Sequence, residues 1–263
     1  MEFYVFALEF RVLRGFPLIS WSGSFVSGVV REILSSTPSV SLVSVSPLFI
    51  EGRVVLSGLV ERDRAGKLRF RYQSVNPASR ISFRFTVSCD GNPPLNIISS
   101  RVSEVGEKRG LTLESISLEA LRLPKDPLGV SGERFQVTID FNPTILMFRS
   151  WPILYPSPAR IIYSTAKTAS QIAGVDLRKV AYKLVRRVEL LEDRTRVERY
   201  TIGRKNGKER IVKAFRGKAV LAVYGRETME LLAALLSVAE KVNIGKSRGI
   251  GFGQIKITKI DKV

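Results

Sequence analysis

The 263-residue chain has no histidine, a single cysteine and no apolar segment long enough to span a membrane. The absence of histidine excludes zinc sites of the Cys/His type, a Ser-His-Asp triad and a Cys-His dyad, and Cys89 as the only cysteine excludes a disulfide framework. Apolar runs fall short of the roughly 18 residues that cross a bilayer. Residues 1–10 carry Glu2 and Glu9 and no basic region typical of a signal peptide. These absences predict a cytoplasmic protein with no membrane anchor, metal or other cofactor.

Acidic side chains are scarce relative to basic ones. The 24 Asp and Glu residues against 42 Lys and Arg residues give a formal net charge of +18 and a pI of about 10.4. Residues 1–130 carry a net charge of +4, residues 131–263 carry +14, and the segment 178–218 alone carries +10. A focused basic region attracts a polyanion, and a pI above about 9 is typical of nucleic-acid binders. The alternatives are the charged surface of a thermophile and a membrane-surface helix, but residues 198–216 lack the wide apolar face of such a helix.

The first half of the chain alternates strand and helix patterns. A helix with an apolar face over 25–34 follows three N-cap candidates, Ser20, Ser22 and Ser24. Strands are predicted over residues 2–13, 53–60, 67–75, 80–88 and 111–123. Residues 89–110 contain Gly, Pro and Asn clusters and predict a loop with at most a short helix. The best linker candidate is Lys125–Gly132.

The second half repeats the same order of elements. Helices are predicted over 159–173 and 226–241, and strands over 134–141, 180–202, 210–224 and 254–258. The two middle strands form a long basic hairpin around Gly203–Gly207, which contains an Asn-Gly turn signal. Each half therefore follows the split βαβ order. The sequence predicts an α+β fold with two tandem ferredoxin-like (βαββαβ) domains and antiparallel sheets, over 1–130 and 131–263.

Glycines and cations alternate near the C-terminus. Residues 242–257 read VNIGKSRGIGFGQIKI, with four glycines within nine residues and Lys246 and Arg248 between them. Glycine allows positive φ and close approach of the backbone to a ligand, and exposed N–H groups of such a turn can bind an anion. The alternative is a glycine-rich turn that binds nothing.

This segment and its neighbours resemble the sixth family of CRISPR-associated endoribonucleases, which cut precursor RNA inside its repeats and have ferredoxin-like folds. That family ends in a helix, a loop of the type G-x-G-x-x-x-x-x-G-φ-G and a last strand, which correspond here to residues 226–241, 243–253 and a strand starting at Gln254. Residues 215–224 and 135–146 also resemble family strands. The resemblance covers most of 133–258, whereas in the first half it depends only on the first strand and helix.

Two positions depart from the family pattern. Asn243 stands where the family usually has its first glycine, and because Asn tolerates the left-handed region we expect the loop to keep its shape. Many members use a histidine near the start of the first helix. Here the corresponding stretch is Ser20–Ser24, which leads to Arg31. Trp21 within it is either a hydrophobic staple or a platform for base stacking, and Ser22 and Ser24 are caps in preference to catalysts.

The resemblance and the charge pattern together nominate site residues. Arg31 would stabilise charge, and Lys246 would donate a proton or neutralise charge; the alternatives are an ion-paired helix residue and a simple phosphate contact. On the hairpin, Tyr200 and Phe215 interleave with the cations. The candidate RNA-binding residues are Arg194, Arg196, Arg199, Arg204, Lys205, Lys208, Arg210, Lys213, Asn243, Gly245, Ser247, Arg248, Gly249, Gly251 and Gly253.

The resemblance implies binding of CRISPR repeat RNA and metal-independent cleavage by attack of a 2′-hydroxyl on the adjacent phosphorus. The absence of histidine leaves open a second function, that of a non-catalytic RNA-binding homologue or effector-complex subunit. A DNA-binding scaffold is disfavoured because no helix-turn-helix or zinc pattern occurs. The expected partner is repeat RNA, while an effector complex and a homodimer stay open and no membrane partner is expected.

Overall fold

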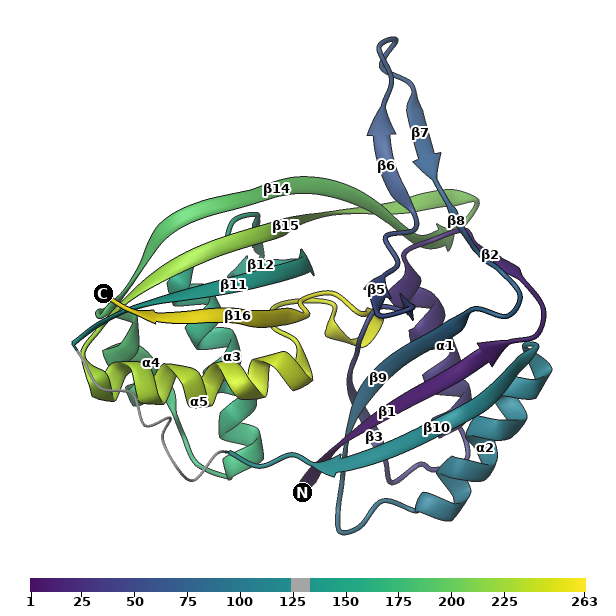
Figure 1. Cartoon of the computed structure of the whole chain (residues 1–263), viewed down its shortest axis with the longest axis horizontal. Coiled ribbons are helices and arrows are strands. Elements are labelled where there is room, and N and C mark those ends of the chain that lie inside the picture. Colours follow the sequence, from purple (N-terminus) through teal and green to yellow (C-terminus); the bar gives the residue numbers. More distant parts are fainter. Residues whose placement is uncertain (124–132) are drawn as a thin grey trace. The chain divides into compact units, whose positions relative to one another are not determined.

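Residues 1–123 and 133–263 are described by the computed structural model and form two units (Figure 1). The first unit contains Met1–Ala120, Glu198–Lys213 and Gly249–Gly251, and the second contains Leu121–Val197, Ala214–Arg248 and Phe252–Val263. The predicted linker Lys125–Gly132 lies outside the described residues, as does the boundary between 130 and 131, so both stay predictions. The outer part of the basic hairpin and three residues of the glycine-rich segment group with the first unit.

The first unit is built on an antiparallel sheet with two helices. Its main elements are β1 (Glu2–Val12), α1 (Ser22–Leu34), β3 (Ser41–Val45), β9 (Arg80–Cys89), α2 (Leu95–Lys108) and β10 (Leu111–Ala120). The strand order is β10-β1-β9, with β3 also paired to β9, which is the order of a ferredoxin-like domain. Because apolar residues alternate along β9, the side chains of Ile81, Phe83 and Phe85 point into the core, where they pack with the apolar faces of α1 and α2.

Short strands extend the first unit. These are β2 (Phe16–Leu18), β4 (Phe49–Ile50), β5 (Arg53–Val54), β6 (Leu59–Arg62), β7 (Leu68–Arg71) and β8 (Gln73–Val75). β2 pairs with β8, and β6 pairs with both β7 and Tyr200 near the outer end of the long hairpin. The predicted strand 53–60 is therefore wrong as one element, because Gly58 at φ +74° breaks the extended backbone between β5 and β6.

The second unit has the same order of strands. Its elements are β11 (Arg134–Thr144), α3 (Pro158–Ala173), α4 (Arg178–Val185), β14 (Val188–Lys205), β15 (Lys208–Tyr224), α5 (Arg226–Val242) and β16 (Ile255–Lys262), with a small hairpin β12 (Leu146–Phe148) and β13 (Trp151–Ile153). The sheet runs β16-β11-β15-β14, and α3 and α5 contribute to its core. β14 and β15 are the two long curved strands of Figure 1, and Asn206 and Gly207 form their turn at positive φ.

The predicted fold class, two ferredoxin-like units in an α+β arrangement, is confirmed. Besides the strand 53–60, two stretches were predicted wrongly. Residues 95–108 form the full helix α2, because Ile98, Val102 and Val105 bury one face despite the preceding prolines. Residues 178–185 form α4, so β14 begins at Val188 and not at 180. Among the described residues, no helix is both long and apolar enough to cross a membrane.

Candidate nucleic-acid interface

The glycine loop, residues 243–253, begins at the end of α5. Asn243 caps that helix at φ 58° and ψ 166°, so φ is positive but the residue is not in the left-handed helical region that the sequence suggested. Its buried side-chain amide donates a hydrogen bond of 3.2 Å to the carbonyl oxygen of Phe252. Across the same loop the N–H of Ile244 donates to the carbonyl oxygen of Gly253. Asn243 therefore holds the two ends of the loop together.

Three of the four glycines are required by the backbone itself. A Cβ on Gly253 would lie 1.8 Å from the carbonyl oxygen of Ile244, and one on Gly245 would lie 2.2 Å from that of Ile145. Gly251, at φ +80°, would place a Cβ 2.8 Å from Cα of Gly23. Gly249 differs, because its φ is not in the left-handed region and nothing lies within 4 Å of an added Cβ. If Gly249 matters, the reason is a ligand and not the fold.

The second unit's part of the loop is anchored to α3 and to the start of β12. The N–H of Gly245 donates to Oγ of Ser164 at 2.7 Å, and the N–H of Lys246 donates to the carbonyl oxygen of Ile145 at 2.8 Å. Nη1 of Arg248 donates to Oγ1 of Thr168 at 2.7 Å. Since Ser164 and Thr168 are four residues apart, they lie on one face of α3 and support the loop together.

Lys246 and Arg248 carry positive charge that no carboxylate neutralises within residues 1–123 and 133–263. Lys246 is exposed, whereas Arg248 is half-buried, and burial lowers the pKa of Arg248 from its ordinary value. A guanidinium that is partly removed from water and meets only a hydroxyl is well placed to bind an anion. Residues 241–260 and 141–175 contain no Asp or Glu at all. The lack of acidic residues in both segments is the signal in the sequence that could have linked α3, with Ser164 and Thr168, to the glycine loop.

Gly249–Gly251 lies against the start of α1 within the first unit. Nε1 of Trp21 donates to the carbonyl oxygen of Ile250 at 2.8 Å, and a Cβ on Gly23 would lie 2.3 Å from that oxygen. Trp21 is fully buried and its ring packs edge-on to Tyr200, so it is not a platform for base stacking. The cap prediction was also wrong: Trp21 is the N-cap residue, Ser22 donates to the carbonyl oxygen of Val55, and no side chain caps α1.

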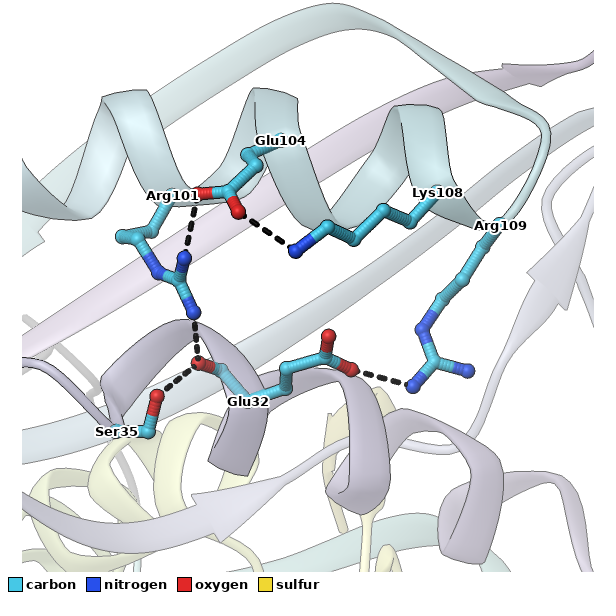
Figure 2. A network of polar contacts seen from close by, with 6 residues as sticks. All are labelled: Glu32, Ser35, Arg101, Glu104, Lys108 and Arg109. Atoms are coloured by element: carbon cyan, nitrogen blue, oxygen red, sulfur yellow. Dashed lines mark hydrogen bonds and ion pairs between the residues drawn. The ribbon is translucent and has the colours of Figure 1, made fainter.

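Arg31 is exposed in the last turn of α1. It lies eight residues beyond Gly23, or about 12 Å along the helix, so it is remote from the turn that contacts Ile250. Its Nε donates to Oγ of Ser27 at 3.3 Å, and among the described residues no carboxylate pairs with it. The neighbouring Glu32 instead binds Arg109 at the end of α2 (Figure 2). A role for Arg31 in catalysis stays a prediction.

The hairpin cations fall into paired and unpaired groups. Arg194 pairs with Glu192, and Arg204 pairs with Glu209. Hydrogen bonds from Thr201 and Arg204 lower the pKa of Glu209, and the same carboxylate raises the pKa of Arg204. Arg196 and Arg199 lie farther down β14, Arg196 exposed and Arg199 half-buried. Exposed cations near the turn that pair with no carboxylate in the described part of the chain are Lys205, Lys208, Arg210 and Lys213.

The aromatic residues of the hairpin do not interleave with its cations at the surface. Tyr200 and Phe215 are both completely buried, the first against Trp21 and the second against Phe141. The adjacent Thr201 and Ala214 are buried as well, so the packing of the hairpin at these points, and not strand alternation, covers both rings. The exposed side chains of the hairpin therefore include its cations and aliphatic residues such as Val197 and Ile211, and neither of the two aromatic rings reaches the surface. Ser247, at φ 64°, completes the set of predicted residues in the loop, and its contact with RNA, like that of the others, stays a prediction.

The chain is similar in part of its sequence and in its fold to known proteins. Residues 141–255 match the family model of the CRISPR-associated endoribonuclease Cas6, and no curated protein matches the chain. A Cas6 product complex shares the fold with a TM-score of 0.63 and 15% identity over 98% of this chain and 99% of that chain. A Thermus thermophilus Cas6 gives 0.60 and 15% over 98% of each chain. In a partial Cas6-RT-Cas1–Cas2 complex, 98% of this chain matches 46% of the longer chain at a TM-score of 0.61 and 10% identity.

Proposed function

We propose that this chain is an endoribonuclease of the Cas6 type, which binds CRISPR repeat RNA and cleaves precursor CRISPR RNA within the repeat. One observation carries the proposal: in the glycine loop, Arg248 and Lys246 hold positive charge without a carboxylate partner in the described residues. The side chains of these two residues supply both donors and charge for a phosphate. The net charge of +18 favours a polyanion over a neutral ligand.

The proposed reaction is a transesterification that needs no metal. The 2′-oxygen of the RNA attacks the adjacent phosphorus, the bond from phosphorus to the 5′-oxygen breaks, and the 2′-proton is lost while the 5′-oxygen gains one. The products are a 2′,3′-cyclic phosphate and a 5′-hydroxyl. Lys246 would neutralise charge or protonate the leaving oxygen, Arg248 would hold the phosphate in line, and Arg31 would stabilise charge on the RNA near α1.

A second function is favoured by a specific observation. The start of α1, where many relatives place a histidine, here consists of Trp21 and Gly23 packed against Ile250, and the chain has no histidine. With no imidazole available, the chain would bind repeat RNA without cutting it. Cleavage and binding alone are separated by experiment and not by fold.

The test is incubation of the purified protein with repeat RNA in EDTA. We expect cleavage, an upstream product that ends in a 2′,3′-cyclic phosphate, and no cleavage when the nucleotide at the cut carries a 2′-deoxy substitution. Because no histidine titrates near pH 6.5, the rate should rise toward alkaline pH without a histidine-type bell. Binding without cleavage in any buffer would support the second function. A cut that requires Mg²⁺ and leaves a 3′-hydroxyl would overturn the mechanism.

Partners other than RNA follow from the same relationship. Since one similar chain is part of a partial Cas6-RT-Cas1–Cas2 complex, we propose that this chain also assembles with other Cas proteins, whereas an effector complex stays a prediction from the sequence. A homodimer stays a prediction from the sequence. Co-purification of the chain with its neighbouring Cas proteins, and light scattering of the chain alone, would test the two separately.

A further inference from the structure

Exposed aromatic side chains gather on the small hairpin β12–β13 in the second unit. Phe148 and Trp151 are direct cross-strand partners, so their side chains lie on the same face of the hairpin. Leu146 and Ile153, the next pair on that face, pack in the core, whereas Phe148 is 44% and Trp151 74% exposed. Tyr155, just beyond β13, is 48% exposed. The hairpin therefore carries apolar rings outward from the core and leaves them in solvent.

The hairpin and the segment after it are stiff. Pro152, Pro156 and Pro158 fix φ at three of seven consecutive positions, which lowers the entropy lost when a ligand binds. Arg149 occupies the turn at φ 54°, a conformation that glycine would adopt without strain. The strained arginine places its guanidinium 5.6 Å from the centre of the Phe148 ring. Strain of this kind is typical of functional positions.

A second guanidinium joins the rings. Cζ of Arg160, in the first turn of α3, lies 4.3 Å from the centre of the Phe148 ring and 5.9 Å from that of Tyr163. Neither Arg149 nor Arg160 pairs with a carboxylate in the described part of the chain, and residues 141–175 contain no acidic residue. The surface is therefore both aromatic and cationic, and residues 141–175 contribute no negative charge that would repel a polyanion.

This surface is continuous with the glycine loop. The carbonyl oxygen of Ile145, immediately before β12, accepts the N–H of Lys246. Arg160, Ser164 and Thr168 are spaced by four along one face of α3, and the last two bind Gly245 and Arg248. Successive members of that row are about 6 Å apart along the helix. A chain of nucleotides bound at the loop can therefore continue directly onto the hairpin.

We propose that the β12–β13 hairpin is a second binding site for single-stranded RNA, in which Trp151 stacks on a base and Arg149 and Arg160 contact the neighbouring phosphates. The inference extends the RNA binding proposed above. Aromatic rings beside unpaired guanidinium groups are the combination by which proteins bind single strands, because every base offers a π-face and every nucleotide a phosphate. A protein partner would be served by the rings alone and would not require an acid-free surface.

The test measures the affinity of a fluorescein-labelled 12-nucleotide oligouridine and of repeat RNA for wild type, Trp151→Leu and Trp151→Phe. Loss of one stacked base is worth about 1–3 kcal/mol, so Trp151→Leu should weaken oligouridine binding about 5-fold to 150-fold, whereas Trp151→Phe keeps a ring and should retain most of the affinity. Because stacking is not ionic, Trp151→Leu should leave the salt dependence unchanged. Arg149→Gln should instead flatten its slope by up to about 0.7.

Fluorescence gives a direct control, since the chain has two tryptophans and Trp21 is buried while Trp151 is exposed. Oligouridine should quench the emission of wild type, and the quenching should disappear in Trp151→Phe although binding persists. If wild type cleaves repeat RNA and Trp151→Leu binds both RNAs equally well, this inference fails alone and the hairpin is left as a protein-docking surface. If wild type binds oligouridine with quenching but ignores repeat RNA, the proposed function fails and this inference stands.

Discussion

Two regions of the molecule differ in whether their cations pair with carboxylates. Arg109 at the end of α2 binds Glu32 of α1, and within α2 both Arg101 and Lys108 bind Glu104 (Figure 2). In the glycine loop and along α3, Lys246, Arg248 and Arg160 have no carboxylate partner among the described residues. The first set is neutralised within the fold and stabilises helix packing. The second set is left with unbalanced charge, which a polyanion can neutralise.

The same contrast recurs within the basic hairpin. Arg204 is held by Glu209, whereas its neighbours Lys205 and Lys208 extend from the turn without a partner in the described chain. A count of basic residues treats all three alike, but only the unpaired ones are expected to release counterions when RNA binds. We therefore propose that pairing separates the cations that stabilise the fold from those that bind RNA, and the predictions on cations below test that separation.

The largest effects are expected in the loop glycines. Gly251→Ala forces a Cβ within 2.8 Å of the backbone at Gly23 and keeps an alanine at φ +80°, which should cost about 2 kcal/mol of stability or more and abolish RNA binding. Gly249→Ala meets nothing within 4 Å and should raise stability by about 0.4–1 kcal/mol, yet weaken RNA binding if the phosphates approach that point. Urea denaturation and filter binding measure both effects.

Gly249→Ala is thus the matched control for Gly251→Ala. If Gly249→Ala binds repeat RNA as tightly as wild type, the RNA does not approach the backbone at residue 249, and the loop contacts it through side chains only. If Gly249→Ala is also destabilised, the open space at that position has been assigned wrongly.

The next largest effect is expected from an unpaired cation. Arg248→Gln removes a half-buried charge that meets only Thr168, so stability should hold while RNA affinity falls about tenfold or more, the worth of a charge-assisted hydrogen bond. Arg109→Gln removes a paired cation and should show the reverse, with a small loss of stability and unchanged RNA affinity. Equal effects of the two substitutions on RNA affinity would show that pairing does not separate the two sets.

A smaller effect is expected at the hairpin. Replacing Lys205 and Lys208 by alanine should flatten the dependence of log K on log salt by about 1.4, since each phosphate neutralised on a single strand contributes about 0.7. Arg204→Gln, which removes a cation held by Glu209, should change the slope less than either lysine. Salt titrations of repeat-RNA binding provide the measurement, and a slope unchanged in the double variant would place this turn away from the RNA.

Sequence patterns predicted the elements with a clear period and missed those that depend on tertiary packing. β9 alternates strictly and α5 has a continuous apolar face, so both were predicted correctly. The sequence did not predict α2, and the cause is physical. Its flanking Gly, Pro and Asn residues indicate a loop, and burial of Ile98, Val102 and Val105 in the core stabilises the helix. The Ser caps failed similarly, because Ser22 donates its hydrogen bond to Val55, which is distant in sequence.

The candidate site was predictable in composition but not in contact. The glycines and cations of residues 243–253 are visible in the sequence. That Gly251 is required by the fold and Gly249 is not depends on the atoms that would surround an added Cβ at each position. The burial of Trp21 and Tyr200 likewise follows from their mutual packing and from the bond of Trp21 to Ile250, neither of which a local pattern contains. Charge density indicated a candidate region, and pairing within the fold decides which of its charges are available.

The smallest effect is a pH dependence of the paired region. The hydrogen bond from Arg109 and the nearby cations lower the pKa of Glu32, and Lys108 and Arg101 lower that of Glu104. A carboxylate whose pKa is lower in the folded state stabilises that state above the unfolded value, about 4.3 for Glu, and the stabilisation is lost as pH falls through the folded pKa. The stability difference between wild type and Glu32→Gln should therefore be fully present at pH 7 and shrink as the pH falls below the unfolded pKa in urea titrations. Since Glu32 is exposed, the difference should be small and should shrink with added salt. RNA affinity at pH 7 should be the same for both proteins. A stability difference between them that grows toward acid pH would show that Glu32 is not neutralised by Arg109.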